Sequence, residues 1–208
     1  MKTIIHFIRH GKTNNPKHIV KGLLPGFLLT KQAKKEAAKL GKFLQKRNIT
    51  QIYFSPTQRT KQTAKIIHSY LPDSKLKSDK RLIEWQTDWE GYTIEQIKKN
   101  PALRWKKYLN DPLHFRTKKG QTASQVTKQM MNFCKEIIKK YQGEEIVAVS
   151  HGDPIKLLLC YIETGKISKK FISYKCSQPS ITSFYFIDKK LKKIIYKSYI
   201  KNQNYFLQ

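Results

Sequence analysis

Acidic residues are scarce in this 208-residue chain. It has 14 Asp and Glu against 42 Lys and Arg, which gives a formal net charge of +28 and an isoelectric point near 10.0. A positive field of this size attracts polyanions and small anionic substrates alike. The basic residues are scattered among all segments and not massed in one arm. This distribution favours a solvated basic surface over a dedicated polyanion-binding tail.

Cysteines are few and long hydrophobic runs are absent. Cys134, Cys160 and Cys176 are an odd number without zinc-ligand or redox spacing, which argues against a disulfide framework and favours a reducing compartment. The first apolar run, residues 4–8, is too short for the hydrophobic region of a signal peptide. No run of about 18 apolar residues is present to span a membrane. We therefore expect a cytoplasmic protein without a membrane partner.

Short β-branched and aromatic runs alternate with helical patterns along the chain. Strands are predicted over residues 3–8, 51–55, 145–149, 183–187 and 194–200, and helices after Thr30, after Pro56 and over residues 93–111, 122–142 and 155–162. Strands that feed helices in this way are typical of an α/β fold, a three-layer α/β/α sandwich with a mostly parallel central sheet. We expect residues 1–208 to form a single domain, with a helical, basic cover segment at about residues 92–124.

Cationic and imidazole side chains follow directly after three of the predicted strands, in Arg9-His10-Gly11, Ser55-Pro56-Thr57-Gln58-Arg59 and Ser150-His151-Gly152. Ligands of open α/β sheets bind outside the carboxyl ends of the strands, so two His and two Arg are expected in one crevice. Arginine guanidinium groups pair bidentately with phosphoryl oxygens, and a neutral imidazole is a competent nucleophile. The pattern predicts a phosphoryl-transfer site, with backbone N–H groups near Gly152 adding to the anion site.

A leaving alkoxide needs a proton, which a carboxylic acid can supply. Glu84 follows the second strand and helix, and its bulky apolar neighbours in Arg81-Leu82-Ile83-Glu84-Trp85 favour a raised pKa.

These motifs resemble the histidine phosphatase superfamily, which includes cofactor-dependent phosphoglycerate mutases and many small-molecule phosphatases. The resemblance rests on four blocks in the right order: Arg9 to Thr13, Ser55 to Arg59 with Gln62-Thr63-Ala64, Arg81 to Gly91, and Val149 to Gly152. It implies a phosphoglycerate mutase-like sandwich, in agreement with the alternation of strands and helices. It implies no metal and no cofactor.

The resemblance implies a role for each site residue. His10 is the phosphate-accepting nucleophile, Glu84 is the proton donor, and Arg9, Arg59 and His151 hold the phosphoryl oxygens. Where the family has an Asn five residues after the Gly of the first block, this chain has Pro16, so Asn14 or Asn15 is expected to take that contact. The chain is also one residue shorter than the family pattern between Glu84 and Asp88 and lacks the customary Gly there, so Asp88 and Glu90 are the alternative acids.

The expected function is hydrolysis of a small cytoplasmic phosphomonoester through a phosphohistidine intermediate. One alternative is a phosphoglycerate mutase, because basic residues of the 92–124 segment, such as Lys98, Arg104 and Arg116, offer a clamp for a substrate carboxylate or second phosphate. The other alternative is a non-catalytic polyanion or nucleic-acid binder. The charge of +28 favours this alternative, and the lack of a nucleic-acid recognition motif argues against it.

Overall fold

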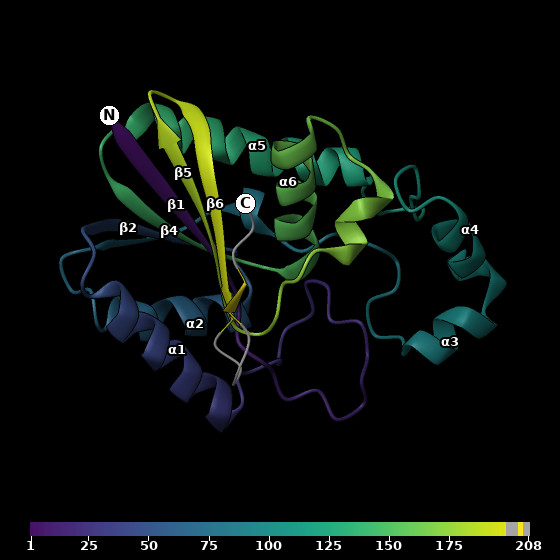
Figure 1. Cartoon of the computed structure of the whole chain (residues 1–208). Helices are drawn as coiled ribbons and strands as arrows, with labels where there is room; N and C mark the ends of the chain where they lie inside the picture. Colours follow the sequence, from purple (N-terminus) through teal and green to yellow (C-terminus); the bar gives the residue numbers. More distant parts are fainter. Residues whose placement is uncertain (199–203, 206–208) are drawn as a thin grey trace.

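A seven-stranded sheet of order β3-β2-β4-β1-β5-β6-β7 runs through the computed structural model, which describes residues 1–198 and 204–205 (Figure 1). Strands β3, β2, β4 and β1 are mutually parallel, and β5, β6 and β7 continue the sheet in antiparallel fashion. The strands are β1 (Lys2–Arg9), β2 (Ile49–Phe54), β3 (Lys75–Ser78), β4 (Glu145–Ser150), β5 (Ser180–Ile187), β6 (Lys190–Ser198) and β7 (Asn204–Tyr205).

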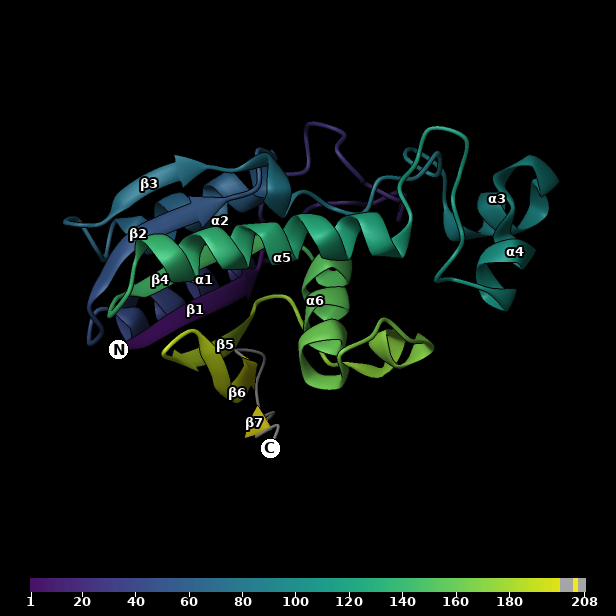
Figure 2. The same ribbon diagram turned by 90° about the horizontal axis from the view of Figure 1, so that it is seen from above.

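Helices cover both faces of the sheet, as Figures 1 and 2 show, which confirms the predicted α/β/α sandwich. Helices α1 and α2 lie on one face, and α5 and α6 lie on the other. The helices are α1 (Lys31–Leu44), α2 (Gln58–His68), α3 (Ile94–Lys99), α4 (Trp105–Asn110), α5 (Ala123–Lys140) and α6 (Gly152–Thr164), with 3₁₀ turns η1 (Lys80–Leu82), η2 (Pro101–Leu103) and η3 (Lys169–Ser173). No helix among the described residues is long and apolar enough to cross a membrane.

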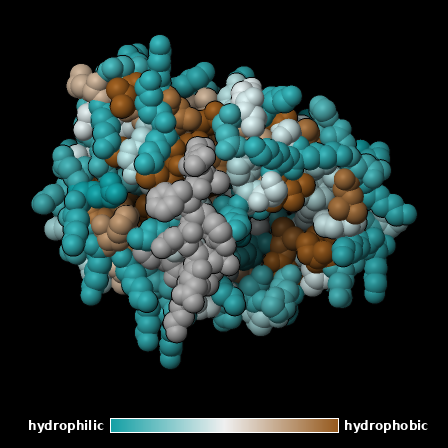
Figure 3. Space-filling view, in the orientation of Figure 1, coloured by the Kyte–Doolittle hydropathy of each residue, from teal (hydrophilic) through white to brown (hydrophobic). Residues whose placement is uncertain are grey.

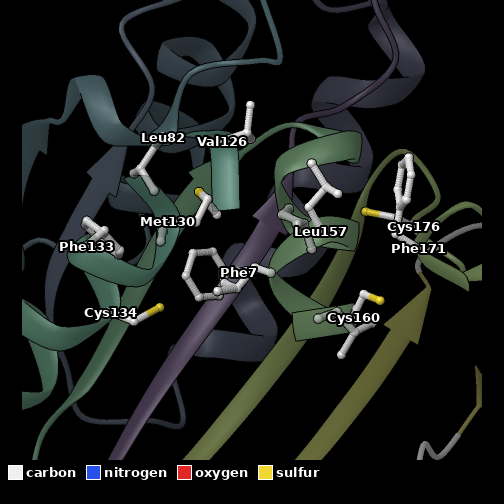
Figure 4. Close-up of a cluster of buried hydrophobic side chains, with 14 of the residues drawn as sticks. Phe7, Leu82, Val126, Met130, Phe133, Cys134, Leu157, Cys160, Phe171 and Cys176 are labelled. Atoms are coloured by element: carbon white, nitrogen blue, oxygen red, sulfur yellow. The ribbon is translucent and has the colours of Figure 1, made fainter. Parts of the chain in front are cut away.

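Strand β1 is buried on both faces because a hydrophobic core lies on each side of it. Phe7 packs against Phe133 of α5, with ring centroids 6.0 Å apart, and lies in the cluster drawn in Figure 4. Ile8 points to the opposite core, with Leu40 of α1 and Ile67 of α2. Central parallel strands covered by helices on both sides have such continuous apolar runs. The two cores fix the carboxyl ends of β1 and β4, which are followed directly by His10 and His151.

Two elements differ from their sequence prediction. The continuous helix predicted over residues 93–111 is wrong, because the segment forms α3, η2 and α4. Asn100 is extended before Pro101, as residues before proline prefer, and Arg104 has a left-handed φ of 61°. Strand β3 was not predicted, because its sequence Lys-Leu-Lys-Ser carries little hydrophobic signal and the strand lies at the exposed edge of the sheet.

The ends of other helices and strands differ from the predicted ones by a few residues. The helix expected from Pro56 begins at Gln58, and α6 begins three residues before the predicted Ile155. The last predicted strand, residues 194–200, begins earlier, at Lys190, and its residues 199–200 lie outside the described residues. Thr30 caps α1 as expected, accepting a hydrogen bond from the Ala33 backbone N–H at 3.1 Å.

The segment that contains α3 and α4 lies beyond the carboxyl ends of the parallel strands (Figure 2). A long loop, residues 12–30, connects β1 to α1 and is joined to this segment through isolated bridges between Ile19 and Thr93 and between Val20 and Glu90. The loop and the segment therefore lie over the edge of the sheet where ligands of α/β proteins bind.

Candidate active site

Three loops that leave the parallel strands bring the predicted residues together. His10 follows β1, Arg59 lies in the first turn of α2 after β2, and His151 is the N-cap residue of α6 after β4. All three are at least 98% buried. The rings of His10 and His151 have centroids 5.2 Å apart and an interplanar angle of 68°. Residues separated by up to 141 positions thus share one crevice.

The hydrogen bonds of His10 assign its tautomer. Its Nδ1 donates to the Gly11 backbone oxygen at 2.8 Å, which leaves Nε2 without a proton. Arg59 Nε donates to this Nε2 at 3.2 Å. Burial, and then the positive charge of Arg59, hold the pKa of His10 well below its ordinary value. His10 is therefore a neutral imidazole with its lone pair directed to Arg59.

Arg59 also organises the second histidine. Its Nη2 donates to His151 Nδ1 at 3.2 Å and to the Gly22 backbone oxygen at 2.6 Å. His151 Nε2 in turn donates to Ser55 Oγ at 2.9 Å. Burial, followed by Arg59, lowers the pKa of His151 far below its ordinary value. In this arrangement one guanidinium group links both imidazoles to the 12–30 loop.

Arg9 lies over the start of α6. One of its amino groups donates to the Cys176 backbone oxygen, whereas its buried Nε finds no hydrogen-bond partner among the described residues. A Cβ on Gly152 would lie 3.0 Å from Arg9 Cζ, so glycine leaves room for the guanidinium group. A buried donor without a partner costs free energy. Arg9 Nε lies beside the start of α6, where the N-terminal N–H groups of the helix favour an anion.

Glu84 reaches the same crevice from the loop after η1. Ser150 Oγ donates to the Leu82 backbone oxygen at 2.8 Å, which holds this loop against the end of β4. Glu84 Oε2 lies 3.8 Å from His151 Nδ1, and the side chain is 22% exposed. Burial, followed by the charge of Asp153, raises the pKa of Glu84 to about 7, although Arg59 opposes the shift. A large share of Glu84 is therefore protonated near neutral pH.

The two alternative acids have other partners. Asp88 accepts a hydrogen bond from the Lys119 backbone at 3.2 Å, and Glu90 accepts one from the Leu23 backbone at 2.9 Å. Neither residue lines the cavity that contains Arg59 and Glu84. The geometry favours Glu84 as the acid.

A cavity of about 330 Å³ opens beside these residues, and Lys21, which sequence reasoning missed, lines it together with Arg59, Glu84 and Asp153. Lys21 Nζ donates to Thr13 Oγ1 at 3.1 Å. Burial, followed by Arg59 and Arg9, lowers the pKa of Lys21 to about 8. Lys21 belongs to no sequence motif. The one signal that could have identified it is its position in the long loop that follows the first motif, Arg9 to Thr13.

The structure does not bring Asn15 to this cavity. Its side-chain amide is engaged within the 12–30 loop, where Nδ2 donates to the Ile19 backbone oxygen at 2.9 Å and Oδ1 accepts from the Ile19 N–H at 3.3 Å. The phosphate contact of Asn15 stays a prediction. Basic residues of the cover segment, among them Arg104 and Arg116, line a separate cavity of about 550 Å³, which adjoins the first at Phe115 and contains neither Arg59 nor Glu84.

Comparisons with known proteins agree with this geometry. The family model of the histidine phosphatase superfamily (branch 1) matches residues 5–195. The protein Rv0525 of Mycobacterium tuberculosis is 28% identical over 198 residues, which cover 94% of this chain and 96% of that protein. Phosphoserine phosphatase 1 of Hydrogenobacter thermophilus is 27% identical over 175 residues, covering 83% and 82%.

A solved structure has the same fold. YhfR of Bacillus stearothermophilus superimposes with a TM-score of 0.83 at 23% identity, covering 91% of this chain and 94% of that one. The family match spans all four motifs, from the strand before His10 to beyond His151. The chain belongs to the histidine phosphatase superfamily.

Proposed function

We propose that this protein hydrolyses a small phosphomonoester through a phosphohistidine formed on His10. The observation that carries the proposal is the neutral, buried His10, whose unprotonated Nε2 lies 3.2 Å from the Arg59 guanidinium group. An imidazole in this state has the free lone pair that nucleophilic attack requires. The relative from Hydrogenobacter, which is named as a phosphatase, supports hydrolysis as the outcome.

In the first step, His10 Nε2 attacks phosphorus and a P–N bond forms while the P–O bond to the alcohol breaks. Arg59 turns its N–H groups from His10 to the phosphoryl oxygens, because anionic oxygens are stronger acceptors than a neutral imidazole. Arg9, with its unpartnered Nε, and the start of α6 bind the remaining charge. The protonated Glu84 gives its proton to the departing alkoxide.

In the second step, a water molecule attacks the phosphohistidine. Glu84, now a carboxylate, accepts the proton of this water as the P–N bond breaks, and His10 returns to its neutral form. A pKa of about 7 suits both roles of Glu84 near neutral pH, because neither the acid nor the base form is rare there.

Hydrolysis is favoured over the mutase reaction by the placement of positive charge. A phosphoglycerate carries a carboxylate besides its phosphate, so its isomerisation calls for cations that hold both groups. The basic residues of the cover line a different cavity. In the catalytic cavity Arg59 is assigned to the phosphoryl oxygens, which leaves Lys21, among the described lining residues, as the cation for a second anionic group.

The test is phosphate release from a panel of phosphomonoesters by the wild-type protein and by His10→Ala. We expect release and an acid-labile phosphoenzyme with the wild type, and neither with His10→Ala. Lys118→Ala, a change in the separate cavity, serves as the matched control and should keep full activity. Conversion of 3- to 2-phosphoglycerate without phosphate release would refute the hydrolase and establish the mutase.

A further inference from the structure

Five aromatic rings form a continuous wall of the catalytic cavity on the side of the cover segment. Trp89 is the central ring, with centroids 5.5 Å from Trp105, 5.2 Å from Tyr108 and 5.1 Å from Phe115. Trp85 extends the wall and lies 6.4 Å from Tyr108. All five residues line the same cavity as Arg59 and Glu84. The wall thus faces the place where the alcohol part of a bound phosphomonoester must lie.

The polar edges of the two inner indoles have partners inside the protein. Trp85 Nε1 donates to the Gln121 backbone oxygen at 2.8 Å, and Trp89 Nε1 donates to the Leu103 backbone oxygen at 2.7 Å. Both rings are thereby fixed by the cover segment, and what they offer to the cavity is apolar ring surface. Trp105 and Tyr108 are only half-buried, so they retain apolar surface that a ligand would remove from water.

The 12–30 loop contributes the apolar side chains of Ile19 and Val20 to the cavity, next to Lys21 of the same loop. On the face shown in Figure 3, a hollow near the middle of the largely hydrophilic surface is bordered by hydrophobic surface on the side of α3 and α4. A space of about 330 Å³ is at the lower end of the range for small-molecule sites. It accommodates one ring system in addition to a phosphoryl group.

The charge that acts on Tyr108 of this wall is acidic, whereas the cation Lys21 lines the cavity from the 12–30 loop. Asp153, in the first turn of α6, lines the cavity with Glu84. Its charge and burial raise the pKa of Tyr108 to about 12, burial having the larger effect. A substrate carboxylate between Asp153 and the aromatic wall would meet like charge and an apolar surface. A hydroxyl or ammonium group would instead find an acceptor in Asp153.

We infer that the preferred substrates are phosphomonoesters of alcohols that carry a planar, apolar ring and no carboxylate, with the ring packed on the wall formed by Trp85, Trp89, Trp105, Tyr108 and Phe115. This inference rests on the proposed hydrolase function and names the substrate class of the same site. The ring gains affinity by burial against aromatic surface, whereas a sugar acid gains nothing there.

The experiment compares kcat/KM for 2-phenylethyl phosphate with that for glycerol 1-phosphate and 3-phosphoglycerate. All three release alkyl alcohols, so a difference reflects binding of the alcohol part and not an easier leaving group. We expect 2-phenylethyl phosphate to be preferred by about tenfold or more, since even one methylene in an apolar pocket is worth about tenfold. Equal values, or a preference for 3-phosphoglycerate, would overturn the inference.

A variant series locates the preference in the wall. Trp105→Ala should lower kcat/KM for 2-phenylethyl phosphate by about tenfold, mainly through KM, and leave glycerol 1-phosphate nearly unchanged. Leu109→Ala is the matched control, because Leu109 lies on the same helix, is 56% exposed and does not line the cavity. Trp105→Phe keeps a ring and should retain most of the preference even if the alanine variant unfolds. An equal loss on both substrates with Trp105→Phe would contradict the inference.

The outcomes separate this inference from the proposed function. If the wild type releases phosphate from all three esters without regard to the ring, the hydrolase stands and the aromatic wall is only structural. If it releases phosphate from none of them, nor from 4-nitrophenyl phosphate, the proposed function itself fails.

Discussion

Burial drives three ionisable residues of the crevice toward their neutral forms. Burial lowers the pKa of His10 and His151, because a charged imidazolium loses its hydration in the protein interior. It raises the pKa of Glu84, because a carboxylate loses its hydration in the same way. The positive charge of the site then comes from Arg9 and Arg59, with Lys21 beside them. One physical cause thus leaves His10 with a free lone pair and Glu84 with a proton beside cationic side chains, which is what the proposed reaction requires.

Glu84→Gln tests the acid. Glutamine fills the same volume but has no acidic proton, so kcat for alkyl phosphates should fall by about 10²- to 10⁴-fold, the usual scale of general acid catalysis. With 4-nitrophenyl phosphate, whose leaving group needs no proton, the loss of phosphoenzyme formation in single-turnover measurements should be much smaller. An equal loss with both substrates would show that Glu84 acts in some other way.

Titration of Glu84 predicts the direction in which kcat/KM changes with pH. Glu84 must be protonated to act as the acid, and its pKa is about 7, so the wild-type kcat/KM for alkyl phosphates should decrease as the pH rises above about 7. The same profile measured with Glu84→Gln should lack the decrease that begins near pH 7 and keep only the one that loss of the Lys21 charge causes near pH 8. A wild-type profile that stays flat from pH 6 to 9 would contradict the assignment.

At the scale of elements, the 12–30 loop is positioned by contacts that involve few residues. Gly22 has a φ of 44°, and a Cβ there would lie 1.9 Å from Glu90 Oε1, so only glycine lets Glu90 reach the Leu23 N–H. The Gly22 oxygen accepts from Arg59 at 2.6 Å. Glu90 and Arg59 together hold the stretch of loop that presents Lys21 to the cavity.

Glu90→Ala should loosen this loop without touching the reacting groups. Loss of one hydrogen bond, worth about 1 kcal/mol, should raise the rate of tryptic cleavage after Lys17 and Lys21 by about fivefold. Mass spectrometry of a digestion time course measures the rate. Glu95→Ala, in the first turn of α3, is the matched control and should leave cleavage in the loop unchanged. Unchanged cleavage in Glu90→Ala would show that the loop is held by other contacts.

Elements with strong hydrophobic patterns were predictable from the sequence, and those without were not. Strand β1 and helix α1 carry clear apolar signals because they pack on central cores. Strand β3 pairs only with β2 at the sheet edge, so its largely exposed side chains follow no pattern. The break at Pro101 followed from local sterics and could have been predicted, whereas the left-handed Arg104 depends on packing of the cover segment.

At the scale of the whole molecule, the sequence predicted which motif residues meet because parallel strands deliver their ends to one edge. His10, Arg59, Glu84 and His151 come together for that reason. Lys21 was beyond prediction, since the course of a long loop depends on tertiary contacts and not on local pattern. The net charge of +28 includes Arg9, Arg59 and Lys21 of the crevice, but it comes mainly from Lys and Arg residues elsewhere in the chain.

At the scale of the whole molecule, the buried histidines should make the stability of the folded protein depend on pH. His6, which lies between Ser183 and Glu145, has a lowered pKa because of burial, as do His10 and His151. Unfolding lets each of them take up a proton near its ordinary pKa of 6.5. Stability is therefore fully present above that value and is lost as the pH falls below it, by about 1.4 kcal/mol per pH unit for each proton that only the unfolded chain binds.

Glu84 opposes this loss, because its raised pKa means that the folded protein binds a proton that the unfolded chain releases above pH 4.5. The unfolded chain takes up three protons on the histidines, and the folded protein takes up one on Glu84, so the free energy of unfolding should decrease from pH 7.5 to pH 5.5. Urea denaturation at each pH measures this free energy. In Glu84→Gln the decrease should be steeper, since the opposing proton is gone. His114→Gln changes an exposed histidine and should behave as the wild type. A free energy of unfolding that rises toward pH 5.5 would mean that the three imidazoles are charged in the folded protein, and His10 would then lack the lone pair that the proposed reaction needs.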